Sequence, residues 1–201
     1  MPKGQPPSGF SATVISSVGT AVGSSSASAE GETLIRTIPP EVRAHFEMWG
    51  EILSETDRGA AILGAAYLDA RLKDAIRIRF CNRGGTASDL LKPNGYLGQY
   101  SAKCQIAYCL GLYGKTTFSN LNIIGQIRNT FAHSKDVLRF TDHTIAKLCN
   151  GLKASAIPYF EISQASQPRN RYLHTVQCIG LILASEMTRD DQPKLLAPRY
   201  D

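Results

Sequence analysis

Three side chains near the middle of the chain could together bind a phosphate and move a proton. In the stretch QIRNTFAHS, Arg128 and Asn129 stand side by side and His133 follows four residues after Asn129. A histidine can give or take a proton near neutral pH, and an arginine can hold phosphate oxygens and stabilise charge in a transition state. These residue types would suit metal-independent cleavage of RNA, in which the 2′-hydroxyl attacks the neighbouring phosphate.

Helical geometry limits how these side chains could cooperate. In a helix each residue advances by about 100°, so Asn129 and His133 share a face, whereas Arg128 and His133 diverge by about 140°. A shared site therefore needs a helix that ends near these residues, a wrapped arginine side chain or a second copy of the chain. In the structural alternative, Arg128 pairs with Asp57, and His133 is only a polar helix edge. The spacing alone leaves both interpretations open.

A run of basic residues is the second candidate site. The chain has a formal net charge of +5, and the segment RLKDAIRIRFCNR holds five basic residues against the single Asp74. Such a strip at the end of a helix could touch nucleic-acid phosphates, although a solvated helix face gives the same pattern. The residues of this basic strip are Arg71, Lys73, Arg77, Arg79 and Arg83.

The remaining composition gives no indication of a metal, a cofactor or a membrane segment. The five cysteines contain no C-x-x-C pair, which fits a reducing, cytoplasmic setting without a disulfide framework or a zinc site. No apolar run approaches the ~20 residues that span a bilayer. Three further histidines are too scattered to form a metal-ligand pattern: His45, His143 and His174.

The chain divides into a tail, one domain and a short C-terminal tail. Residues 1–36 are rich in Ser, Gly, Ala and Pro and are expected to be disordered, residues 37–190 to form the domain, and residues 191–201 to be a tail. Apolar residues recur at helical spacing almost throughout the domain, and period-2 alternation is nearly absent. We therefore predict an all-α fold, a single helical bundle of about five to seven helices.

Several helix boundaries follow from local signals. Thr56 or Asp57 should cap a long helix that runs to about residue 80, and its many small residues should let another helix approach closely. Ser101 could cap a later helix, and the helix that carries QIRNTFAHS should begin near Ser119. Two apolar stripes are expected to face the core, in the first and the last helix: Val42, Phe46, Trp49 and Leu53, and Val176, Ile179, Leu183 and Met187.

Four segments together resemble the mannitol operon repressor (MltR-like) family of bacterial proteins. They occur in the family's order and spacing and lie within a region from about residue 40 to 155: ETDRGAAILGAAYLDARL, GYLGQYSAKCQIAYCLGL, SNLNIIGQIRNTFAHS and FTDHTIAKLC. That family is similar to the wider HEPN group of helical bundles, whose signature of an arginine, a polar residue and a histidine falls here on Arg128, Asn129 and His133.

The resemblance implies two functions. The first is a cytoplasmic, homodimeric transcriptional regulator, a repressor without a helix-turn-helix of its own that works through a protein partner or RNA. The second is a dimeric, metal-independent endoribonuclease in which His133 is the general acid or base, Arg128 holds the scissile phosphate and Asn129 orients either group. Asp57 and Arg58 would support that site by pairing with Arg128 or with phosphate. Neither function calls for a cofactor, a metal or a membrane.

Overall fold

The structure, a computed structural model, describes residues 40–80, 84–153 and 167–188. Within these ranges the chain is helical and contains no strand, which confirms the all-α prediction. The tails expected at residues 1–36 and 191–201 lie outside the described residues. The helices are α3 (Pro40–Ser54), α4 (Asp57–Arg79), α5 (Gly85–Leu90), α6 (Tyr100–Cys109), α7 (Lys115–His133), α8 (His143–Asn150) and α9 (Pro168–Thr188).

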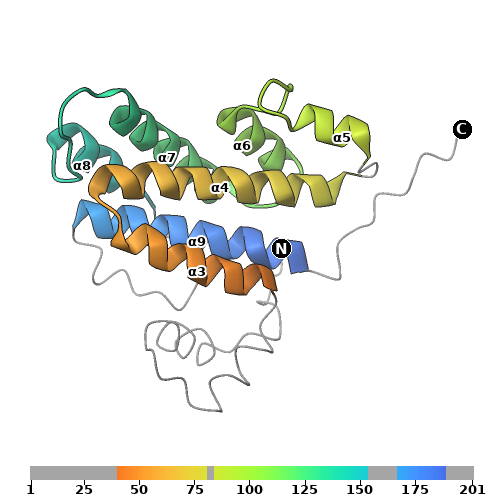
Figure 1. The fold of residues 1–201 in the computed structure, drawn as a ribbon, viewed down its shortest axis with the longest axis horizontal. Helices are drawn as coiled ribbons and strands as arrows, with labels where there is room; N and C mark the ends of the chain where they lie inside the picture. The colour runs from red at the N-terminus through yellow and green to blue at the C-terminus, as the bar shows by residue number, and fades with distance from the viewer. Residues whose placement is uncertain (1–39, 81–83, 154–166, 189–201) are drawn as a thin grey trace, which may run out of the picture.

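The long helix α4 runs through the middle of the bundle. It packs against α3 and α9 on one side and against α6 and α7 on the other, while α8 joins α7 and α9 at one end (Figure 1). The core between these layers includes Leu68, Leu72, Ile124, Ile127 and Ile179, all fully buried. Because α4 contacts both layers, it holds α6 and α7 against the layer formed by α3 and α9.

Small residues allow α4 and α9 to lie close together, as expected. Thr56 caps the beginning of α4, because its hydroxyl accepts a hydrogen bond from the Gly59 N–H at 3.1 Å.

Within α4, Gly64 allows α9 to come close, because a Cβ placed there would lie 3.1 Å from the Tyr172 hydroxyl oxygen. That hydroxyl donates to the Ala61 carbonyl oxygen at 2.8 Å. A larger side chain at position 64 would therefore push α9 away from α4.

A buried polar contact joins α3 to α4. Nδ1 of His45 lies 2.6 Å from the Tyr67 hydroxyl, and α9 passes so close that a Cβ at Gly180 would be 2.8 Å from both rings. Burial, and secondarily the nearby Arg71 guanidinium, lowers the pKa of His45 to about 4. His45 is therefore neutral at neutral pH and belongs to the packing of three helices.

The core-facing stripes were predicted correctly for α9 and incorrectly for part of α3. In α9, Val176, Ile179 and Leu183 are fully buried. In α3, Ile52 is fully buried, whereas Leu53 is 49% exposed and does not belong to the core. No described helix is long and apolar enough to cross a membrane.

Candidate functional site

The stretch QIRNTFAHS forms the C-terminal part of α7, which ends at His133. The Ser134 N–H closes the helix by donating to the Thr130 carbonyl oxygen at 3.3 Å. Asn129 and His133 are exposed, whereas Arg128 is half-buried and turned toward α4. The divergence of Arg128 and His133 expected from helical geometry is therefore present in a helix that remains regular up to His133.

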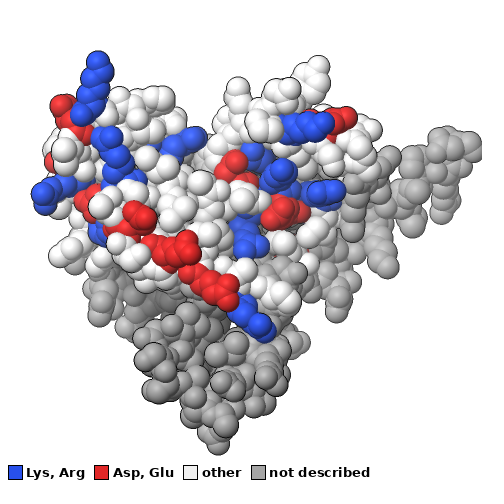
Figure 2. Space-filling model, viewed as in Figure 1, with Lys and Arg blue, Asp and Glu red and all other residues white. Residues whose placement is uncertain are grey.

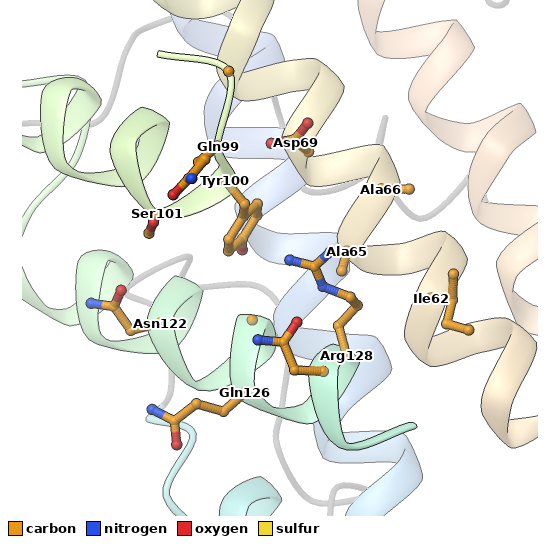
Figure 3. Close-up of a pocket in the computed structure, with 13 residues that line it drawn as sticks. Ile62, Ala65, Ala66, Asp69, Gln99, Tyr100, Ser101, Asn122, Gln126 and Arg128 are labelled. Carbon is orange, nitrogen blue, oxygen red and sulfur yellow. The ribbon is translucent and has the colours of Figure 1, made fainter. Parts of the chain in front are cut away.

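Arg128 and Asn129 line a cleft of about 760 Å³ between α4, the beginning of α6 and α7. Figure 3 shows the guanidinium of Arg128 pointing from α7 toward Tyr100 and Asp69 on the opposite walls. His133 is not among the lining residues. The cleft thus brings together two of the three predicted site residues and leaves the histidine outside. The other lining residues are Ile62, Ala65, Ala66, Asp69, Gly98, Gln99, Tyr100, Ser101, Asn122, Gly125 and Gln126.

The charge of Arg128 is not neutralised within the part of the chain that the structure describes. Its guanidinium carbon lies 5.7 Å from the centroid of the Tyr100 ring, a distance typical of a cation–π contact. Its Nε is buried and has no hydrogen-bond partner among the described residues, and no described carboxylate forms an ion pair with it. A buried donor without a partner is costly, so this guanidinium is well suited to an anionic ligand.

Tyr100 is held firmly in the opposite wall. Its hydroxyl donates to the Leu121 carbonyl oxygen at 3.1 Å, and Gly125 lets its ring approach α7, because a Cβ there would lie 3.1 Å from the ring. Burial, and to a lesser degree Cys104, holds the pKa of Tyr100 well above its usual value. The phenol therefore stays protonated and keeps this hydrogen bond.

Among the described residues that line the cleft, the one carboxylate, that of Asp69, already forms an ion pair. Oδ1 of Asp69 lies 3.0 Å from Nζ of Lys103, which is almost fully buried and also donates to the Gly98 carbonyl oxygen at 2.7 Å. Asp69 and Lys103 together fix α6 and the loop before it onto α4. The positive charge of Arg128 thus remains in excess on this cleft.

Asp57 and Arg58, the predicted supporting residues, have partners other than Arg128. Asp57 accepts from Nη1 of Arg169 at 2.5 Å and from the Phe140 N–H at 2.9 Å. Arg58 donates to the carbonyl oxygens of Ser134 and Asp136, at 3.1 and 2.7 Å. The expected pair between Asp57 and Arg128 is therefore not formed in the described structure, because the start of α9 supplies the partner instead. Arg58 holds the loop that follows α7.

The predicted basic strip is interrupted. Arg79 forms a 2.7 Å ion pair with Glu186 of α9, and the Arg71 guanidinium carbon lies 5.3 Å from the centroid of the Tyr67 ring. Lys73 and Arg77 are exposed, and Arg83 lies outside the described residues. Over the face shown in Figure 2, basic residues are interspersed with acidic ones instead of forming one patch. Among the described residues, no group of three or more His, Cys, Asp or Glu side chains could hold a metal ion.

The sequence analysis identified Asn129 but missed two other amide side chains that line the cleft with Arg128, those of Asn122 and Gln126. Asn122, Gln126 and Asn129 all line the cleft, and their spacing of four and three residues places them on one face of α7. That spacing is visible in the sequence and could have revealed a continuous polar face. The contribution of Tyr100 and Ser101 could not be found in this way, because it depends on how α6 packs against α7.

Comparison with known proteins yields one distant structural likeness. No protein-family model matches the chain, and no curated protein matches it. The X-ray structure of the MtlR–HPr complex from Escherichia coli matches with a TM-score of 0.49 and 19% identity, over 72% of this chain and 96% of that chain. An identity and a score this low do not transfer a function.

Proposed function

We propose that this chain is a regulator of the mannitol operon repressor type that works by binding and not by turnover. In this proposal it is a homodimeric helical module without its own helix-turn-helix, and it controls transcription through a protein partner or RNA. The motif resemblance within a region from about residue 40 to 155 supports the family assignment. Two apolar side chains exposed one turn apart on α4, Ile62 and Ala66, support contact with a second copy.

The arrangement around the cleft is the observation that carries the proposal. Arg128 offers an unneutralised charge inside the cleft, while His133 is exposed at the end of α7 and does not line it. A general acid or base must come within about 2.6–3.2 Å of the proton that it transfers, or reach it through one water. Within one chain the arrangement therefore has the binding group in place and lacks the proton-transfer group.

A metal-independent endoribonuclease of the HEPN type is the second candidate. The unneutralised guanidinium of Arg128 favours it, because such a group could hold a scissile phosphate. This candidate requires a second copy of the chain to bring its His133 to the cleft. The regulator therefore requires Arg128 but not His133, whereas the endoribonuclease requires both residues.

Complementation of a deletion strain distinguishes the two candidates. We would place a reporter under the mannitol operon promoter and reintroduce wild type, Arg128→Ala or His133→Ala. The proposal predicts that the deletion derepresses the reporter, that wild type and His133→Ala restore repression, and that Arg128→Ala does not. The endoribonuclease requires both variants to fail. An unchanged reporter in the deletion strain would remove the proposed regulator.

A further inference from the structure

The cleft presents a positive charge at one wall, and none of the described residues that line it offers a carboxylate free of an ion pair. Arg128 forms no ion pair with any described residue, and its buried Nε has no partner there. Asp69 is the only acidic residue among the described residues that line the cleft, and its Oδ1 lies 3.0 Å from Nζ of Lys103 in an ion pair. The cleft is therefore electrostatically complementary to an anion that lies against Arg128.

The beginning of α6 adds backbone donors to the same cleft. The N-cap residue Gln99 forms no side-chain capping hydrogen bond, and Gln99, Tyr100 and Ser101 all line the cleft. The first N–H groups of a helix have no intrahelical partner, and the helix dipole makes this end favourable for negative charge. The first turn of α6, including Ser101, and the guanidinium of Arg128 thus line the same cleft from different elements.

The remaining polar wall carries uncharged hydrogen-bonding groups. Asn122, Gln126 and Asn129 line the cleft from one face of α7, which lies more than about a quarter-turn round the helix from Arg128. Carboxamides both donate and accept, so they suit the hydroxyl groups of a ligand. The volume of about 760 Å³ lies within the range of about 300–1,000 Å³ that is usual for small-molecule sites.

We infer that this cleft binds a small hydroxylated organic anion, a phosphate ester or a carboxylate. Arg128, the first turn of α6 and Ser101 bind the anionic group, and the carboxamides of α7 bind the hydroxyl groups. The inference deepens the proposed regulatory function, because such a ligand would be the signal to which the regulator responds. RNA is less suited to the cleft, because Arg128 is the only basic residue among the described residues that line it, whereas a long polyanion needs several cations.

Direct binding measurements on the full chain test this inference. The probes are glycerol 3-phosphate and glycerate, with glycerol as the neutral control and sodium chloride at matched ionic strength. Isothermal titration calorimetry gives the dissociation constant, and thermal unfolding shows whether the folded state is stabilised. At least one of the two anions should bind and raise the melting temperature, and glycerol should do neither. Tighter binding of glycerol 3-phosphate would indicate a phosphate ester as the ligand, and tighter binding of glycerate would indicate a carboxylate.

Two variants and one control tie binding to the cleft. Arg128→Gln should weaken binding at least tenfold, while Arg139→Gln, at an exposed arginine in the loop between α7 and α8, should bind like wild type. Ser101→Asp places a carboxylate in the first turn of α6, where it favours the helix but repels an anion. This variant should keep or raise the melting temperature and lose binding, which excludes misfolding as the cause.

Three outcomes would overturn the inference. They are binding of neither anion beyond the effect of chloride, undiminished binding by both Arg128→Gln and Ser101→Asp, and tight binding of a short single-stranded RNA that neither small anion can match. The reporter assay is independent of these results. If repression depends on Arg128 but no anion binds, the proposed ligand is wrong and the proposed regulator stands. If an anion binds but deletion leaves the reporter unchanged, the proposed regulator is wrong and the ligand site stands.

Discussion

Asp57 and Arg169 form an ion pair across 112 positions of sequence, with Oδ1 of Asp57 at 2.5 Å from Nη1 of Arg169. The same guanidinium donates to the carbonyl oxygens of Leu53 and Glu55, at 3.3 and 2.7 Å. Because Asp57 also accepts from the Phe140 N–H, the pair links the end of α3, the beginning of α4, the loop before α8 and the beginning of α9. It is therefore a structural contact that leaves Arg128 unpaired.

Removing Arg169 should destabilise the fold. Arg169→Ala leaves a half-buried carboxylate with one backbone donor, so we expect a loss of about 2 kcal/mol in the free energy of unfolding. Urea titration followed by circular dichroism measures this quantity. Arg77→Ala, at an exposed arginine of α4, is the matched control and should change it little. Equal stabilities of the two variants would contradict a structural role for the pair.

Removing Arg128 should change stability very little. Since its guanidinium forms no described ion pair and only stacks over Tyr100, Arg128→Ala should alter the free energy of unfolding by less than about 1 kcal/mol. The structural alternative, a buried pair with Asp57, would instead cost about 3–5 kcal/mol. The same urea titration decides between them, and a loss in the larger range would contradict our assignment of Arg128 to ligand binding.

Much of the fold was predictable because helices leave local signals. The Thr56 cap and the buried stripe of α9 both appear where the sequence placed them. The start of α7 was less clear: it begins at Lys115, four residues before the expected Ser119. Two β-branched threonines, Thr116 and Thr117, weaken the local helical signal there, whereas Thr117 is buried in the bundle, so tertiary packing favours the helix at this point.

Other features depend on tertiary packing and could not be read from spacing. In α3, Ile52 and Leu53 are adjacent apolar residues, and contact with α4 and α9 decides that Ile52 is buried. The partner of Asp57 is Arg169, which lies 112 residues later in the sequence at the beginning of α9, so no local pattern reveals it. For the same reason the sequence identified Arg128 and Asn129 but could not place them in a cleft with Tyr100.

Two helical glycines should respond in opposite ways to replacement by alanine. A Cβ at Gly180 would lie 2.8 Å from the rings of His45 and Tyr67, so Gly180→Ala should cost about 1–3 kcal/mol. A Cβ at Gly50 would meet nothing within 4 Å, so Gly50→Ala should stabilise by up to about 1 kcal/mol. Thermal unfolding of both variants measures the difference. Changes of the same sign would contradict the close approach of α3, α4 and α9.

Buried His45 should make the fold sensitive to mild acid. Its pKa is lowered to about 4 by burial and by Arg71, from 6.5 in the unfolded chain, so between these values the unfolded state binds more protons. Stability should therefore fall as the pH drops from 6.5 to 4, by about 3 kcal/mol from this group.

The control for this pH dependence is His45→Gln, which cannot take up a proton and can still hydrogen-bond to Tyr67. Its free energy of unfolding should fall less steeply than that of wild type over the same pH interval, whatever its stability at pH 7. Urea titrations at a series of pH values measure both slopes. Parallel curves for the two proteins would show that His45 is not the group responsible.

We propose that Arg128 binds a ligand in a cleft that His133 of the same chain does not line, so that the protein regulates without cleaving RNA. Incubation of the purified full chain with single-stranded RNA in EDTA tests this claim most directly. We expect no cleavage above the buffer control for wild type, Arg128→Ala or His133→Ala. Cleavage by wild type that disappears in His133→Ala would contradict it.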